Sequence, residues 1–200
     1  RDSGIAEETI VFFLGDNGSG YSSLPLRGKK AERYEGGTRV PFIVSWAQPN
    51  DSPLQDCWPI PQGILHNSSF GTILDLMPTI LKLTGTQPPK DYIMDGNDLR
   101  TVTAGEGAQT FLMHFPHKHR SAYFTTWHSG DWKLIYQYSA KPRIQLFNLA
   151  QDIDESNDLA IQRPERLQEM FSEMESALNE CQALYPTDPQ SKRLLRPYLN

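Results

Sequence analysis

An aspartate and an asparagine that follow an apolar run are the first residues of this sequence whose types and spacing suit cation binding. Residues 10–14 read Ile-Val-Phe-Phe-Leu, with the length and the β-branched and aromatic content of a buried strand. The run ends at Gly15, and Asp16 and Asn17 follow directly. Their carboxylate and carbonyl oxygens are hard ligands, placed where open α/β sheets bind ligands. Asp-Asn-Gly is also a common turn sequence, so the triplet alone leaves both interpretations open.

Lys30 is a second group that could take part in chemistry. An ammonium beside a tetrahedral oxyanion offsets the negative charge that develops as an ester bond breaks. The alternative is a solvated loop lysine, and spacing alone does not separate the two. Arg27 and Arg39 could also meet anions, but an arginine beside Glu35 or at a strand entry more often forms a structural ion pair.

Apolar periodicity predicts the elements of the first half of the chain. Residues 42–46 form a second apolar run of strand length. A helical pattern follows, which Ser68 or Ser69 would cap and Gly85 would close. Pro78 falls inside this pattern, so we expect a break or kink just before it.

The second half of the chain predicts a small antiparallel sheet covered by one long helix. Four aromatic or β-branched runs are separated by turn residues, and Gly130 favours a hairpin between the second and the third. These runs are residues 111–115, 122–127, 132–138 and 144–149. From Pro164 to about Leu184, an apolar stripe at helical spacing predicts a helix that covers the sheet.

The stretch around the aspartate–asparagine pair resembles the sulfatase family of the alkaline-phosphatase superfamily. In that family a strand ending in Asp-Asn-Gly precedes Leu-Arg-Gly-Gly-Lys-Gly, a short spacer and Glu-Gly-Gly. This sequence has Asp-Asn-Gly at 16–18, Leu-Arg-Gly-Lys-Lys-Ala at 26–31 and Glu-Gly-Gly at 35–37, in the same order and spacing. Lys29 and Ala31 stand where the family usually has glycine, which gives a bulkier loop.

The resemblance implies roles for individual residues. It makes Asp16 and Asn17 ligands of a divalent metal, with Ca²⁺ expected first and Mg²⁺ as the alternative. It makes Lys30 the catalytic residue that contacts the sulfate. A His-Phe-Pro-His string after an apolar strand also resembles bacterial sulfatases, which implies that His114 and His117 contact the substrate.

The implied fold class is α/β, with an alkaline-phosphatase-like sheet segment followed by a small antiparallel sheet with a C-terminal helix. We expect residues 1–105 to be the C-terminal part of the sulfatase α/β domain and residues 106–200 to be a small α+β subdomain. Residues 75–79 and 95–99 also resemble family segments, and the first of these is expected to have a structural role. The resemblance covers nearly the whole of this chain but only the C-terminal part of the family's length.

The family's nucleophile has no counterpart in this sequence. It is a Cys or Ser, converted to formylglycine in a Cys/Ser-x-Pro-x-Arg motif, and it attacks sulfur in sulfate-ester hydrolysis. Two further Asp ligands also lie in the family's N-terminal half. Neither Cys57 nor Cys181 fits the motif. The opening Arg-Asp-Ser-Gly is not typical of a natural start, so the expected partner is a missing N-terminal part of the same protein.

Composition narrows the classes of partner. With 38% hydrophobic residues, a chain of 200 residues can bury one sizeable core. The net charge is −5 and no basic block stands out, which argues against nucleic acid. No apolar run approaches the roughly 18 to 20 residues of a membrane span. We expect a sulfated small molecule or carbohydrate as substrate and, by family resemblance, a periplasmic, secreted or lysosomal location.

Two alternatives remain open at this point. A phosphoester or phosphonate hydrolase of the same superfamily would share the Asp-Asn metal pair. A noncatalytic fragment or module, which binds sulfated ligands or pairs with an N-terminal chain, would need no nucleophile.

Overall fold

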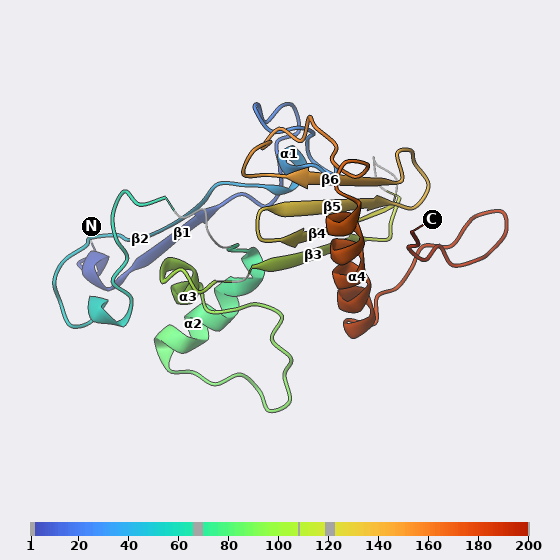
Figure 1. Cartoon of the computed structure of the whole chain (residues 1–200). Helices are drawn as coiled ribbons and strands as arrows, with labels where there is room; N and C mark the ends of the chain where they lie inside the picture. Colours follow the sequence, from blue (N-terminus) through green and yellow to red (C-terminus); the bar gives the residue numbers. More distant parts are fainter. Residues whose placement is uncertain (1–2, 66–69, 108, 119–122, 200) are drawn as a thin grey trace. The chain divides into compact units, whose positions relative to one another are not determined.

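The computed structural model describes residues 3–65, 70–107, 109–118 and 123–199 (Figure 1). Its contacts divide the chain into two compact units. The first comprises Arg1–Gly15 and Pro41–Gln109, and the second comprises Asp16–Val40 and Thr110–Asn200. Residues 16–40, here called the motif loop, therefore group with the C-terminal elements. The boundary expected near residue 105 stays a prediction.

The first unit contains a two-stranded ribbon and several short helices. Its elements are η1 (Ala6–Glu8), β1 (Ile10–Leu14), β2 (Phe42–Trp46), η2 (Gln55–Cys57), η3 (Ile73–Asp75), α2 (Leu76–Thr84) and α3 (Leu99–Thr103). Strands β1 and β2 pair antiparallel along their whole length, so both predicted strands are confirmed. Among the described residues, no helix is long and apolar enough to cross a membrane.

One expectation about β1 is wrong for the residues that the structure describes. We predicted a buried strand, yet Val11 and Phe13 are 46% and 60% exposed. Side chains alternate along a strand, and only one face of this ribbon is covered. On that face Phe12 lies with its ring centroid 6.2 Å from that of Trp58.

The predicted helix around Pro78 forms in two pieces, as expected. The 3₁₀ turn η3 leads into α2, and Pro78 falls in the first turn of α2, where its missing N–H has no intrahelical partner to lose. Gly85 ends the helix at a φ of 65°, which confirms the predicted stop. The expected caps, Ser68 and Ser69, lie outside the described residues.

Asp75 joins the start of α2 to the start of α3. Its buried carboxylate accepts the backbone N–H of Thr72 at 2.6 Å and that of Asn97 at 2.7 Å. The Thr79 hydroxyl donates to the Asp75 carbonyl at 2.6 Å and accepts the N–H of Leu99 at 2.8 Å. These contacts fit the structural role expected for this segment.

Replacing Asp75 with alanine should lower the free energy of unfolding of the chain by about 3 kcal/mol, because two N–H groups lose their acceptor. Urea denaturation of the two proteins measures the difference. The matched control is Asp51→Ala, at an exposed aspartate, which should change stability by less than about 0.5 kcal/mol. Equal losses in both variants would contradict the role given to Asp75.

The second unit contains the predicted antiparallel sheet and its covering helix. Its elements are α1 (Glu35–Thr38), β3 (Thr110–Phe115), β4 (Phe124–Ser129), β5 (Trp132–Gln137), β6 (Ile144–Asn148) and α4 (Pro164–Glu180). The strands pair antiparallel in the order β3-β4-β5-β6, and Gly130 turns β4 into β5 at a φ of 55°. The predicted sheet, hairpin and helix start are confirmed.

The end of α4 differs from the prediction. The helix ends at Glu180 rather than near Leu184. Gln182 adopts a φ of 51°, a left-handed conformation that stops an α-helix. Leu184 lies beyond this stop and is 82% exposed.

The sheet of the second unit is covered on both faces. Helix α4 crosses one face (Figure 1) and buries Met170, Phe171, Met174 and Leu178 there. Because side chains alternate, Ile135 of β5 points to the opposite face. There it packs with Phe147 and with Tyr34 of the motif loop. The motif loop therefore covers the face of the sheet opposite α4.

Candidate active site

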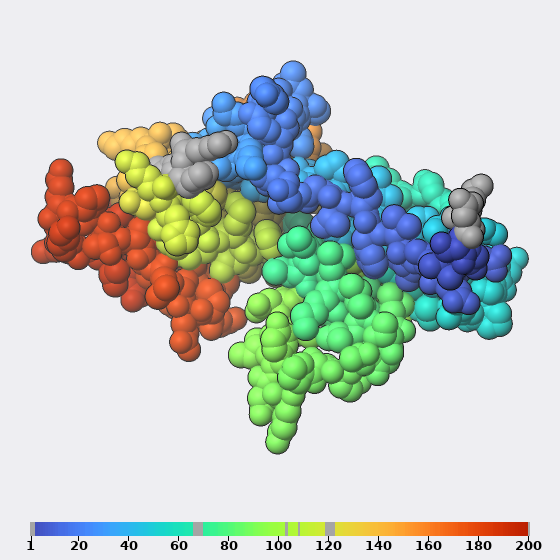
Figure 2. All heavy atoms as spheres, turned by 180° about the vertical axis from the view of Figure 1, so that it is seen from behind, coloured from blue at the N-terminus to red at the C-terminus, as the bar shows by residue number. Residues whose placement is uncertain are grey.

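The structure places the three principal predicted site residues on the motif loop. Asp16 is exposed, Asn17 is half-buried, and the Asn17 amide donates a hydrogen bond to the Asp16 carboxylate. The Lys30 side chain is exposed, and its backbone N–H donates to the Ser19 carbonyl at 2.8 Å. The turn that carries the candidate ligands is thus hydrogen-bonded to the segment that carries the lysine. Much of this loop lies at the surface in Figure 2, in mid-blue.

The donor set fits part of a calcium site. Asp16 and Asn17 offer hard oxygens from adjacent side chains, whereas Ca²⁺ takes six to eight oxygen ligands. In the described part of the chain, no group of three or more His, Cys, Asp or Glu side chains is arranged to hold a metal ion. Two protein ligands from this loop leave most of the coordination sphere to other donors.

Three glycines let the motif loop fold closely on itself. A Cβ on Gly18 would overlap the carbonyl oxygen of Gly36. A Cβ on Gly36 would overlap the carbonyl of Gly28, and one on Gly37 would overlap that of Glu32. The Gly18 N–H also donates to the Gly37 carbonyl at 3.1 Å. These contacts fix the candidate ligand turn against helix α1.

The two departures from the expected glycine pattern have different consequences. Ala31 adopts a φ of 72°, a conformation that is cheap for glycine and costs other residues about 1 kcal/mol. Lys29 has no such conformation, and its carbonyl accepts the N–H of Glu32 at 2.9 Å. The loop thus keeps a glycine-like backbone at Ala31.

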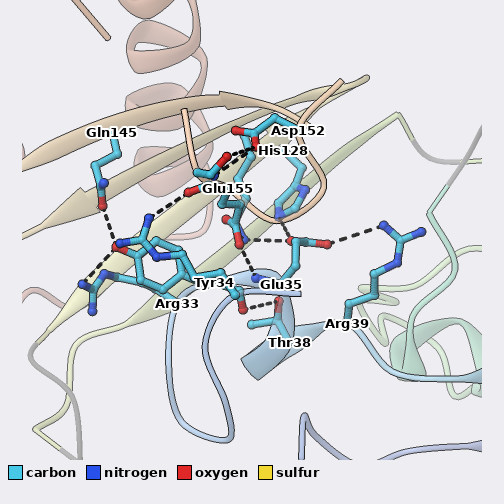
Figure 3. Close-up of polar contacts among 12 residues, drawn as sticks. Arg33, Tyr34, Glu35, Thr38, Arg39, His128, Gln145, Asp152 and Glu155 are labelled. Carbon is cyan, nitrogen blue, oxygen red and sulfur yellow. Dashed lines mark hydrogen bonds and ion pairs between the residues drawn. The ribbon is translucent and has the colours of Figure 1, made fainter. Parts of the chain in front are cut away.

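A buried cluster of charged residues joins the motif loop to the sheet (Figure 3). The Lys133 ammonium of β5 lies 2.8 Å from Glu35 Oε1 and 2.8 Å from Glu155 Oε1. The backbone N–H of Glu35 donates to Glu155 Oε2 at 2.6 Å. His128 Nε2 of β4 lies 3.7 Å from Glu35 Oε1, and Arg39 lies 3.7 Å from Glu35 Oε2. We refer to Glu35, His128, Lys133 and Glu155 as the charge cluster.

Burial sets the electrostatics of the charge cluster. Lys133 and Glu155 are 0% exposed, and Glu35 is 5% exposed. Burial raises the pKa of Glu35, but the Lys133 ammonium, with His128 and Arg39, outweighs it, so the pKa lies below its usual value. Burial also raises the pKa of Glu155, which Lys133 only partly offsets, so that pKa stays above its usual value.

Arginine contacts extend this attachment of the loop. Arg27 donates to the Glu155 carbonyl at 2.8 Å, and its guanidinium lies 3.9 Å from the centroid of the Tyr34 ring. The Tyr34 hydroxyl donates to Gln145 of β6 at 2.9 Å. Arg39 forms a structural ion pair, the commoner of the two alternatives, and its partner is Glu35. Arg27 uses a hydrogen bond and a ring contact instead.

The predicted substrate contacts of the histidine string stay predictions. The two ring nitrogens of His114 lie 2.8 Å from the Thr125 hydroxyl and 2.8 Å from the Leu184 carbonyl. Burial lowers the pKa of His114, which favours the neutral ring. His117 is exposed, and its ring lies nearly perpendicular to that of Phe115, with the centroids 5.6 Å apart. Among the described residues, the hydrogen-bond and ring partners of His114 lie outside the motif loop.

Sequence reasoning missed most of the charge cluster. In the sequence His128 has no nearby partner that marks it as functional, and Lys133 lies within the apolar strand run 132–138. A lysine inside such a run was the available signal, because a charged side chain in a strand covered on both faces needs a buried partner. The partners themselves lie 98 residues away at Glu35 and in the loop after β6 at Glu155.

The buried imidazole of His128 predicts a pH dependence of stability. Burial, with the neighbouring Lys133 ammonium, lowers its pKa from 6.5 to about 4. Between pH 6.5 and pH 4 the His128 imidazole is protonated in the unfolded chain but neutral in the folded chain. The free energy of unfolding therefore falls as the pH drops towards 4. The loss from this group is about 3 kcal/mol. Urea denaturation between pH 7 and pH 4 should show this extra loss relative to His128→Gln, and parallel curves would contradict it.

Comparisons with known proteins agree on one family. The family model described as Sulfatase matches residues 1–86. The steryl-sulfatase of Mus musculus is 29% identical over 150 residues, which cover 66% of this chain and 22% of that protein. The N-acetylgalactosamine-6-sulfatase of Canis lupus familiaris is 36% identical over 113 residues, which cover 52% of this chain and 20% of that protein. The chain thus spans about a fifth of the length of these relatives.

A solved structure shows the same fold over most of the chain. The crystal structure of Ps i-CgsB matches with a TM-score of 0.70 and 26% identity, covering 86% of this chain and 37% of that one. The expected mixed α/β architecture, with its four-stranded antiparallel sheet and C-terminal helix, is therefore confirmed.

Proposed function

Because the Sulfatase family model matches residues 1–86 and the similar proteins are named sulfatases, we propose that this chain is part of a sulfatase and supplies the metal-binding and sulfate-binding loop of a sulfuric ester hydrolase. The observation that carries the proposal is the placement of the predicted residues. Asp16, Asn17 and Lys30 follow the family order, and the backbone of Lys30 is hydrogen-bonded to Ser19 beside the ligand pair. The charge of Asp16, opposite in sign to that of Lys30, suits a site that holds both a cation and an anion.

Each residue has a defined task in this proposal. Asp16 and Asn17 would bind the metal through their side-chain oxygens, and calcium is the expected ion because both donors are hard. A bound divalent cation supplies Lewis-acid stabilisation of sulfate oxygens. The Lys30 ammonium would lie against the sulfate and offset the charge that develops on the bridging oxygen. The exposed position of the Lys30 side chain leaves it accessible to a ligand.

The substrate class and partner follow from the same premise. The names of the relatives state a steryl sulfate or a sulfated N-acetylgalactosamine, so we propose a sulfated carbohydrate or steroid as substrate. We also propose that the nucleophile and the remaining metal ligands come from an N-terminal sulfatase segment. By the same resemblance, the location would be periplasmic, secreted or lysosomal.

The test is calcium-dependent arylsulfatase activity of the purified chain with its intact mass confirmed. Alone it should be inactive and bind calcium weakly, because most ligands are absent. We call the combination of this chain with an N-terminal sulfatase chain that carries the formylglycine motif the reconstituted enzyme. It should hydrolyse an aryl sulfate. Activity of the chain alone would contradict the incomplete site. A reconstituted enzyme that hydrolyses an aryl phosphate but not an aryl sulfate would support the phosphoester alternative.

A further inference from the structure

The charge cluster connects the proposed active-site loop, which ends at Val40, to the sheet, whose first strand begins at Thr110. Lys133 lies between two carboxylates, one from the motif loop and one from the loop after β6. Glu155 contacts the motif loop twice: its carboxylate accepts the Glu35 N–H, and its carbonyl accepts Arg27. Both Lys133 and Glu155 are 0% exposed, so neither is available to touch a substrate.

The contacts continue from the charge cluster to the candidate ligands. Glu35 is followed by Gly36 and Gly37, whose backbones contact the rest of the motif loop. The Gly37 carbonyl accepts the N–H of Gly18, next to Asn17, and the Gly36 N–H donates to the Arg27 carbonyl at 2.7 Å. A shift of Glu35 would therefore move the backbone beside the ligand turn.

We propose that Lys133 and Glu155 are positioning residues that hold the motif loop, and with it Lys30 and the ligand pair, in the geometry that the reaction needs. This inference rests on the proposed function. A buried ion cluster adds little net stability compared with apolar residues of similar volume, because desolvation opposes the attraction. Its main contribution here is to geometry: three charged groups fit together in one arrangement, which fixes Glu35 against the sheet.

The test uses a charge-balanced variant, Lys133→Met/Glu155→Gln, which removes one positive and one negative charge at nearly constant volume. Hydrogen exchange of the chain should be at least about tenfold faster at the motif-loop amides of Gly18, Lys30 and Gly37, with β4 and β5 unchanged. The control, Leu178→Ala, makes a cavity under α4 on the opposite face of the sheet and should loosen α4 first.

In the reconstituted enzyme the same variant should lose about 100-fold in kcat and about tenfold in calcium affinity at temperatures below its transition, whereas Leu178→Ala, compared at matched stability, should keep both. Glu155→Gln alone keeps an acceptor for the Glu35 N–H and should retain most of the activity. If Lys133 and Glu155 had a purely structural role, the variant would have a lower melting temperature but an unchanged kcat at temperatures below thermal unfolding.

Three results would overturn the proposal: unchanged exchange of the loop amides, faster exchange with unchanged kcat and calcium affinity, or a loss of kcat equal to that of Leu178→Ala at matched stability. Failure of the proposed function gives a different pattern. The reconstituted unmodified protein would then be inactive, while the exchange experiment would still decide whether Lys133 and Glu155 hold the loop.

Discussion

Replacing Gly18 with alanine is expected to lower the free energy of unfolding by at least about 3 kcal/mol and to abolish activity of the reconstituted enzyme. The added Cβ would overlap the carbonyl oxygen of Gly36 and lie 2.7 Å from the Cα of Gly37. Both atoms belong to the backbone, so no side-chain rotation relieves the overlap. The loop must open, and the candidate ligands Asp16 and Asn17 move with it.

Gly20 provides the matched control for this change. It lies two residues further along the same turn, and a Cβ there would meet nothing within 4 Å. Gly20→Ala should therefore leave stability within about 0.5 kcal/mol of the original and leave activity intact. Urea denaturation and arylsulfatase assays of the two variants give the comparison, and similar behaviour of both would rule out close packing as the reason for Gly18.

Replacing Lys30 with alanine should lower kcat of the reconstituted enzyme by about 10²- to 10³-fold while leaving the fold intact. Removal of one group that stabilises developing negative charge typically has an effect of this size. The Lys30 side chain is exposed, and its hydrogen bond to Ser19 uses the backbone N–H, which alanine keeps. The loop should therefore retain its conformation, and the effect should appear in kcat rather than in stability.

The neighbouring Lys29 separates this role from a general effect of positive charge. It is also exposed and carries the same charge one residue earlier. Lys29→Ala should change kcat by less than about threefold, because a solvent-exposed charge outside the site acts weakly through water. Equal losses in the two variants would indicate that the loop contributes only its net charge, and the catalytic role of Lys30 would be wrong.

The elements of the fold follow from local patterns in the sequence. The apolar stripe after Pro164 is enough to predict α4, because apolar residues at three- and four-residue steps form one face of a helix. Four residues of this face are buried against the sheet. Gly130 marks the turn between β4 and β5 for an equally local reason, its positive φ. The end of α4 was predicted too late because the left-handed conformation of Gln182 has no local signal in an amino acid of that type.

The candidate site is predictable only in part, for a physical reason. Asp16, Asn17 and Lys30 belong to one continuous motif, so their grouping is visible in the sequence. The charge cluster depends instead on tertiary contacts, which bring Glu35 to Lys133 and Glu155 over 98 and 120 residues. No periodicity links residues at such separations. A lysine within an apolar strand signals that a partner exists without identifying it.

The long separation between Glu35 and Glu155 has a consequence for the order of events during synthesis. All three principal candidate site residues leave the ribosome early, but the loop that carries them has its buried partner 120 residues later. At about 5 to 20 residues per second, the delay is about 6 to 24 s. Lys133 follows Glu35 after 98 residues and Glu155 after 120, so for most of that interval the loop has neither residue to pack against.

Assembly of the site is thereby coupled to completion of the chain. A product that terminates before β5 would contain Asp16, Asn17 and Lys30 but would lack the sheet that holds them. Such a product would present these candidate site residues without a fixed arrangement. The arrangement of the candidate site residues is therefore complete only after the last strands have been made.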